Sequence, residues 1–128
     1  MKILLDTHTA LWWMNNPKKL SYTAKEILLD DDNKLHFSLV SAWEIAIKTS
    51  RGRLTEFPGG VRSFLAKIKA SPITQLSLIS SYIETAEDLP FIHRDPFDRL
   101  LIATALADSM TILTADENIH KYPIPTIW

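Results

Sequence analysis

Four acidic residues stand where a sheet of parallel strands would collect them. Asp6 follows the first short apolar run, and Asp116 comes just after another. Glu44 lies in the first turn of the helix expected after the second run, and Asp98 lies in the first turn of a later helix. Because the carboxyl ends of parallel strands share one edge of a sheet, we expect these carboxylates to meet there.

Carboxylates brought this close repel one another and raise each other's pKa unless a cation neutralises them. Oxygen ligands suit a hard divalent ion, so the four acids predict a site for Mg²⁺, with Mn²⁺ as a substitute. Mg²⁺ takes few direct carboxylates, so we expect Asp6 and Asp98 to bind it directly, and Glu44 and Asp116 to act through water or to hold a second ion. A metal-activated water would then hydrolyse a phosphodiester bond.

Helix capping is the alternative explanation for each acid, because carboxylates favour helix N-termini. The stretches 41–44 and 114–117 both fit the Ser/Thr-x-x-Glu capping box. The second box uses Glu117, however, and leaves Asp116 unexplained. A buried strand end also gains nothing from an unpaired charge at Asp6. Taken together, the four acids favour a site over four caps.

Three further residues beside these acids have two interpretations each. Asp95 precedes Pro96 and lies one helical turn from Asp98, so it either caps that helix or approaches the metal; we expect the cap. Thr7 and Thr114 either orient neighbouring carboxylates or have simple turn and cap roles.

Apolar runs too short for helices alternate along the chain with segments of helical periodicity. In the segment 61–70, for example, the apolar residues recur at the spacing of one helix face. Strands are expected at residues 2–5, 35–38, 73–78, 111–113 and 124–127, and helices at 10–13, 21–29, 41–50, 61–70, 79–88 and 95–108.

This alternation predicts an α/β fold with a parallel central sheet and helices on both faces, because parallel neighbours need crossover connections. The chain has 128 residues, 46% of them hydrophobic, which suits one domain spanning residues 1–128. The Pro58-Gly59-Gly60 cluster is interpreted as a loop between helices.

The overall composition excludes several classes of protein. With no cysteine there is no thiolate catalysis or disulfide, and with no long apolar run there is no expected membrane span, so we expect a cytoplasmic protein. The net charge of −1 argues against general nucleic-acid binding, yet residues 45–83 carry six basic residues against the single acid Glu56. The basic residues of that segment are Lys48, Arg51, Arg53, Arg62, Lys67 and Lys69.

The local motifs resemble those of PIN-domain ribonucleases, in particular the VapC-like toxins of type II toxin–antitoxin systems. The resemblance rests on Leu4-Leu5-Asp6-Thr7-His8, Ser41-Ala-Trp-Glu44, His93-Arg-Asp-Pro-Phe-Asp98-Arg and Leu113-Thr-Ala-Asp116. It runs from about residue 2 to the C-terminus and keeps the order of the family's motifs. The Asp-Pro-Phe-Asp-Arg string is its most specific part.

The resemblance implies a three-layer α/β/α sandwich and metal-dependent cleavage of RNA. Asp6, Glu44, Asp98 and Asp116 match the family's acidic quartet. The resemblance also implies two protein partners, a cognate antitoxin that blocks the active-site groove and a second copy of the chain in a homodimer.

Several basic and aromatic residues are candidates for substrate binding. Arg94 and Arg99 near the acids, and Lys48 and Arg51 in the basic segment, either contact RNA phosphates or belong to solvated helix faces. The aromatic side chains of Trp12, Trp13 and Trp43 either stack on bases, anchor a partner helix or pack in the core. For His8 we expect a packed, hydrogen-bonded side chain, since nitrogen is a poor ligand for Mg²⁺.

Two rival functions were compared with the nuclease. A phosphoacceptor receiver domain would need adjacent acids after the first strand and a lysine near the last, and neither is present. A catalytically silent PIN-fold module that binds RNA or protein remains the alternative, although such a module usually lacks an acid. The absence of a Gly-rich phosphate loop and of a nucleophile elbow sets other hydrolase classes aside.

Overall fold

A computed structural model describes residues 1–52 and 59–128, and its centre is a five-stranded, all-parallel sheet with the strand order β3-β2-β1-β4-β5. The predicted α/β class with a parallel sheet is confirmed. The strands are shorter than predicted at the two edges of the sheet, where neighbours are fewest. They span Lys2–Leu5 (β1), Lys34–Ser38 (β2), Thr74–Leu76 (β3), Thr111–Leu113 (β4) and Thr126–Ile127 (β5).

The order of the strands reverses beside β1. The chain builds β1, β2 and β3 outwards in one direction and then returns to place β4 on the free side of β1, where Leu5 pairs with Leu113. In open parallel sheets, the carboxyl ends of the strands at such a reversal border a crevice that binds ligands. Asp6 and the 114–116 segment leave the sheet at this point.

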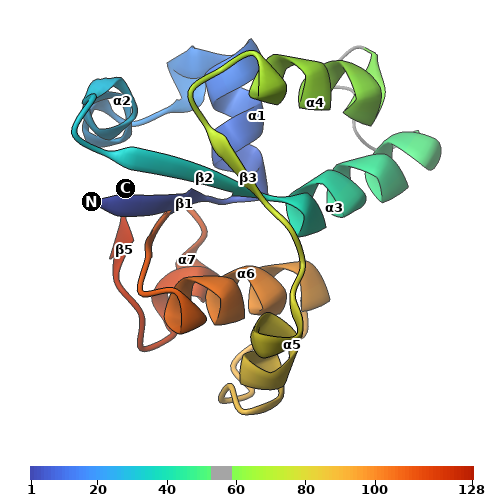
Figure 1. Cartoon of the computed structure of the whole chain (residues 1–128), viewed down its shortest axis with the longest axis vertical. Helices are drawn as coiled ribbons and strands as arrows, with labels where there is room; N and C mark the ends of the chain where they lie inside the picture. Colours follow the sequence, from blue (N-terminus) through green and yellow to red (C-terminus); the bar gives the residue numbers. More distant parts are fainter. Residues whose placement is uncertain (53–58) are drawn as a thin grey trace.

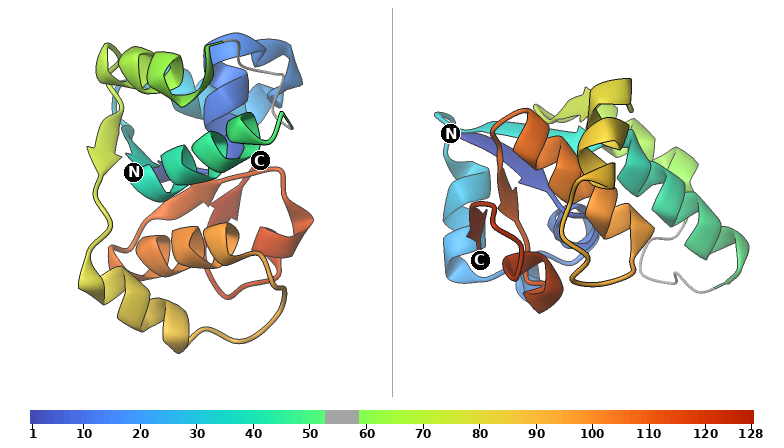
Figure 2. Two further views of the ribbon diagram at one scale, coloured as in Figure 1. Left: turned by 90° about the vertical axis from the view of Figure 1, so that its right-hand side faces the viewer. Right: turned by 90° about the horizontal axis from the view of Figure 1, so that it is seen from below.

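Helices cover both faces of the sheet (Figure 1, Figure 2). One layer holds α1, α2 and α4, the other holds α5, α6 and α7, and α3 extends from the carboxyl edge of β2. The three-layer sandwich is thus confirmed. The helices span Thr7–Asn15 (α1), Tyr22–Leu29 (α2), Leu39–Ser50 (α3), Gly60–Lys69 (α4), Ser80–Glu87 (α5), Pro96–Ala107 (α6) and Glu117–His120 (α7), with a 3₁₀ turn at Pro17–Lys19.

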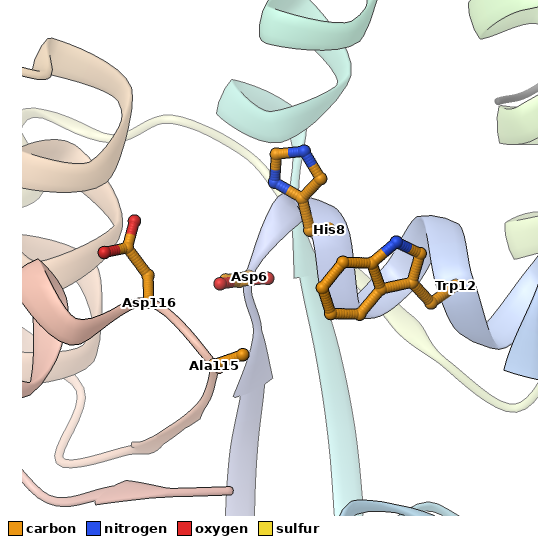
Figure 3. A pocket seen from close by; sticks show the side chains of 5 residues that line it. All are labelled: Asp6, His8, Trp12, Ala115 and Asp116. Atoms are coloured by element: carbon orange, nitrogen blue, oxygen red, sulfur yellow. The ribbon is translucent and has the colours of Figure 1, made fainter. Parts of the chain in front are cut away.

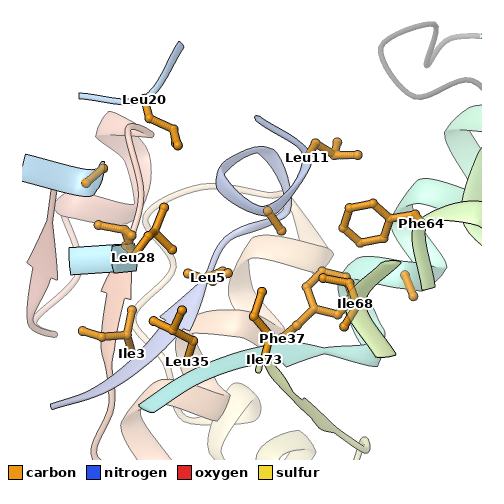
Figure 4. Close-up of a cluster of buried hydrophobic side chains, with 14 of the residues drawn as sticks. Ile3, Leu5, Leu11, Leu20, Leu28, Leu35, Phe37, Phe64, Ile68 and Ile73 are labelled. Carbon is orange, nitrogen blue, oxygen red and sulfur yellow. The ribbon is translucent and has the colours of Figure 1, made fainter. Parts of the chain in front are cut away.

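The alternating side chains of β1 divide the core into two clusters. Ile3 and Leu5 point into the first cluster, which contains Phe37 and Phe64 and lies under α1, α2 and α4 (Figure 4). Leu4 points to the opposite face, against α6. All three strand residues are completely buried, and each burial stabilises the fold by about 1.5–3 kcal/mol. This burial fixes β1 and therefore the position of Asp6.

Three helices differ from the prediction. The helix expected at 10–13 already begins at Thr7, because the side chain of Asp6 accepts the amide N–H of Thr9 and caps it. The helix expected from Ser41 begins at Leu39, because the side chain of Ser38 accepts the amide N–H of Val40 and caps it. Glu44 therefore lies in the second turn, and the predicted capping box is wrong. The short helix α7 was not expected; Asp116, not Thr114, is its N-cap residue.

The loop interpretation is confirmed at Gly59, the N-cap residue of α4, whose φ of 95° suits glycine, whereas Gly60, with φ of 66°, is already the first residue of α4. Pro58 of that loop, and Arg53 and Glu56 of the basic segment, lie outside the described residues. Within the described ranges, none of the helices is long and apolar enough to cross a membrane.

Candidate active site

Asp6 occupies the junction of β1 and α1. Its Oδ1 accepts the amide N–H of Thr9 at 2.8 Å and so caps α1, and its Oδ2 accepts the hydroxyl of Thr114 at the end of β4. Burial raises the pKa of the Asp6 carboxyl, while the hydrogen bonds from Thr114 and Thr9 oppose that rise. The carboxylate of Asp6 is thus buried and held in one orientation, and it links the end of β1 to the end of β4.

Thr114 links two of the predicted acids. Its hydroxyl donates to Asp6, and its Oγ1 accepts the amide N–H of Asp116 at 3.0 Å. Asp116 in turn caps α7, because its Oδ1 accepts the amide N–H of Asn118 at 2.8 Å. The orienting role considered for Thr114 is therefore present in the structure, and it holds Asp6 and Asp116 beside the same crevice.

Glu44 is buried, and both of its carboxylate oxygens have partners. Oε1 accepts the hydroxyl of Thr7 at 2.7 Å, and Oε2 accepts Lys48 Nζ at 2.7 Å. Since Thr7 has a single hydroxyl proton and gives it to the carboxylate, its Oγ1 accepts from Ser41, 2.8 Å away. Thr7 follows Asp6 directly, so this contact brings the helix that carries Glu44 against the end of β1.

Asp98 is held by a histidine that the sequence reasoning did not assign. His93 Nε2 lies 3.2 Å from Asp98 Oδ2, and His93 Nδ1 lies 2.8 Å from the hydroxyl of Tyr122. The same hydroxyl receives a hydrogen bond from Arg99 at 3.2 Å, which leaves its own proton for His93 Nδ1. Nε2 then carries the imidazole proton and donates it to Asp98.

Burial and the neighbouring negative charges raise the pKa of Asp98 to about 7. Burial is the largest cause, and the negative charges of Asp95, Asp116 and Glu44 act in the same direction, whereas the hydrogen bond from His93 opposes them. The negative charges of Asp116 and Glu44 thus act on the Asp98 carboxyl through space, whereas Asp95 is also joined to Asp98 by a hydrogen bond. Asp95 has the expected capping role, because its Oδ1 accepts the amide N–H groups of Phe97 and Asp98 at 2.9 and 3.0 Å.

A pocket of about 300 Å³ opens between the start of α1 and the 114–116 segment (Figure 3). Asp6 lies at its centre, with Asp116 and Ala115 on one side and His8 and Trp12 on the other. The pocket thus lies at the strand-order reversal, between two of the predicted acids. His8 is exposed there rather than packed, contrary to the expectation.

The donor set suits a hard divalent cation. The acids at this edge offer only carboxylate oxygens, the ligands that Mg²⁺ and Mn²⁺ prefer, and their mutual repulsion would be relieved by positive charge. In the described part of the chain, however, no three acidic or histidine side chains stand close enough together to form a ready-made metal site. The acids share the edge but are not drawn together around one point.

The four basic residues considered for substrate binding differ in their surroundings. Lys48 is paired with Glu44. Arg99 donates to the carbonyls of Pro90, Ala86 and Leu89 at 2.9, 3.4 and 3.5 Å as well as to Tyr122, so it closes the end of α5. The side chains of Arg51 and Arg94 are exposed.

Comparison with known proteins identifies the family. The sequence model of the PIN domain matches residues 3–125. Ribonuclease VapC22 of Mycobacterium tuberculosis is 32% identical over 130 aligned residues, which cover 98% of each protein. This chain therefore belongs to the PIN-domain family, and the resemblance drawn from its motifs is confirmed.

Several solved structures share the fold of this chain. The VapBC2 complex of Rickettsia felis contains a chain that superposes with a TM-score of 0.73 at 19% identity, covering 99% of this chain and 98% of that one. A DNA-bound VapBC of Salmonella typhimurium gives 0.70 at 15% identity, covering 99% and 97%. FitAcB of Neisseria gonorrhoeae gives 0.64 at 15% identity, covering 98% and 96%.

Proposed function

We propose that this protein is a metal-dependent endoribonuclease and the toxin of a toxin–antitoxin pair. The observation that carries the proposal is the meeting of Asp6 and Asp116 beside one pocket at the carboxyl edge of the sheet, where Thr114 holds both, with Asp98 near enough for Asp116 and Glu44 to act on its carboxyl. Buried carboxylates that destabilise one another are costly to the fold unless a cation joins them. The similarity to a ribonuclease over nearly the whole chain supports the same activity.

In this proposal Asp6 and Asp98 bind Mg²⁺ directly, and Glu44 and Asp116 act through water or hold a second ion; Mn²⁺ substitutes. When bound, the metal supplies an activated water and neutralises charge on the phosphodiester. Thr114 and His93 fix the orientation of Asp6 and Asp98, respectively. Thr7 and Lys48 do the same for Glu44, and Lys48 adds positive charge at the edge of the acidic cluster.

Arg94 and Arg51, both exposed, extend the RNA-binding surface beyond Lys48. For Arg99 we propose a smaller contribution to phosphate binding, because its guanidinium already donates hydrogen bonds to the carbonyls at the end of α5. The substrate is RNA, cut within the cytoplasm by a single domain formed from residues 1–128.

A cognate antitoxin and a second copy of the chain are the proposed protein partners. One similar structure, from Klebsiella pneumoniae, is described by its name as a toxin–antitoxin complex. The chain also has an exposed apolar groove of about 330 Å³ between α3 and α6. An apolar groove of this kind supports a protein partner, without distinguishing the antitoxin from a second copy. It is lined by Leu39, Val40, Trp43, Leu78, Pro96, Phe97 and Leu100.

Cleavage of a structured RNA pool tests the nuclease. Wild-type protein, freed of any antitoxin, is incubated with the pool and with Mg²⁺, Mn²⁺ or EDTA, beside an Asp98→Asn variant. The matched control is Asp31→Asn, because Asp31 is an exposed acid between α2 and β2. We expect metal-dependent cleavage that Asp98→Asn loses and Asp31→Asn keeps. Wild-type protein that binds RNA without cutting it would favour the catalytically silent PIN-fold module instead.

A further inference from the structure

One wall of the acidic pocket is aromatic, and the metal chemistry gives it no role. His8 and Trp12 lie four residues apart on α1 and so share one face of that helix. Their ring centroids are 5.7 Å apart, and both side chains line the pocket beside Asp6 (Figure 3). His8 is exposed and Trp12 is half-buried, so a ligand in the pocket would touch both rings.

The indole of Trp12 is held in place from several sides. Its centroid lies 5.8 Å from that of Trp128, and Lys19 Nζ lies 5.8 Å from the indole centroid. The rings of His8 and Trp128 are tilted by 47° and 59° to the indole, so neither is stacked in parallel on it. Trp12 is therefore ordered before a ligand arrives, which lowers the entropic cost of stacking against it.

We propose that His8 and Trp12 bind an unpaired nucleobase of the RNA substrate, next to the phosphodiester held at Asp6 and Asp116. This inference rests on the proposed ribonuclease function and specifies its substrate as a single-stranded segment. In the proposed nuclease, the substrate places its phosphodiester, with a cation between, against the acids, and a planar group of the same substrate would lie against the rings. A nucleotide has both groups joined together.

The geometry also favours single-stranded over double-stranded RNA. In an A-form helix the bases are stacked on one another, and side chains cannot enter the deep, narrow major groove. An unpaired base in a loop or bulge can turn out and stack on aromatic side chains. The pocket of about 300 Å³ therefore selects for the unpaired state, not for a particular base sequence.

A base-deletion cycle tests this proposal. The ligands are short, fluorescein-labelled 2′-O-methyl RNA strands, each with one abasic site at a different position, and a denaturing gel verifies that they stay intact during the measurement. Fluorescence anisotropy gives Kd in the presence of Mn²⁺. Because stacking of one base on an aromatic side chain changes affinity about 5- to 100-fold, wild-type protein should lose that much when one particular base is missing. The Trp12→Leu variant should bind more weakly and be insensitive to the same deletion.

Trp43→Leu is the matched control, because Trp43 is exposed and lines the apolar groove rather than the pocket that contains His8 and Trp12. It should retain the wild-type dependence on the deleted base. If Trp12→Leu unfolds, as circular dichroism would show, His8→Ala takes its place, since His8 is exposed; it too should reduce the effect of the deletion. Deletions that weaken wild type and variant equally, or a wild type that does not bind the strands, would overturn the stacking site.

The failure of this inference is distinguishable from failure of the proposed function. Metal-dependent cleavage of the RNA pool without coupling between Trp12 and any base refutes the stacking site and leaves the nuclease intact. Coupling without cleavage supports the stacking site and refutes the nuclease.

Discussion

His93 and Asp98 are joined by a hydrogen bond of 3.2 Å, and Tyr122 fixes the imidazole from its other side. The carboxylate of Asp98, which is proposed to bind a metal, is thus oriented by an imidazole that Tyr122 itself holds in place. Loss of such an outer partner typically costs 10- to 100-fold in metal affinity or activity.

His93→Ala should therefore weaken Mn²⁺ binding by about 10- to 100-fold, because the Asp98 carboxylate loses its orientation. Isothermal titration calorimetry measures the affinity. The control is His36→Ala on β2, since His36 contacts the carbonyl of Ile3 rather than an acid. Equal affinities of His93→Ala and wild type would show that the contact between His93 and Asp98 does not serve the metal.

Asp98→Asn should stabilise the metal-free protein while abolishing its stabilisation by Mn²⁺. At pH 8 the substitution removes a charge that burial disfavours and that Asp95, Asp116 and Glu44 repel, and we expect Tm in EDTA to rise by about 5 °C. Saturating Mn²⁺ should raise the Tm of wild type but not that of the variant, as it binds only the intact acids. Differential scanning calorimetry with and without EDTA measures both effects; a variant less stable than wild type in EDTA would contradict the proposed repulsion.

Thr114→Val should destabilise the fold by about 1–3 kcal/mol, because it leaves Asp6 Oδ2 buried without its hydroxyl donor. The variant should also lose cleavage activity, since the Asp6 carboxylate can then rotate. Urea unfolding measures the free energy. The control Thr104→Val replaces a buried threonine whose hydroxyl bonds only the Leu100 carbonyl of its own helix, and it should cost less.

The raised pKa of Tyr82 predicts that the free energy of unfolding depends on pH in the alkaline range. Burial, and then the hydrogen bond to Asp108, raise the pKa of Tyr82 to about 12. A raised tyrosine pKa contributes stability that is complete below the unfolded value of about 10 and is lost as the pH rises towards 12. The difference in unfolding free energy between wild type and Tyr82→Phe should thus be about 1 kcal/mol at pH 8 and shrink above pH 10. A constant difference from pH 8 to 11 in urea unfolding would contradict it.

Much of the site could be predicted because its acids follow local signals. Asp6 follows an apolar strand, and the Asp95-Pro96 pair predicts the start of the helix that carries Asp98. The start of α3 was misplaced because Ser38 and Ser41 are both competent caps. Burial of Ser41 beside Thr7, a contact between distant segments, decided between them.

The sequence by itself determined the α/β class, the approximate positions of its strands and helices and the four acids, because periodicity, capping and strand termination depend on neighbours along the chain. Only the tertiary structure decided the strand order around β1, the partners of each carboxylate and the aromatic pocket. These features join residues far apart in sequence, such as Asp6 with Thr114 and His93 with Tyr122. Packing of the two core clusters on opposite faces of β1 brings such residues together, and no local pattern records which distant side chains will meet.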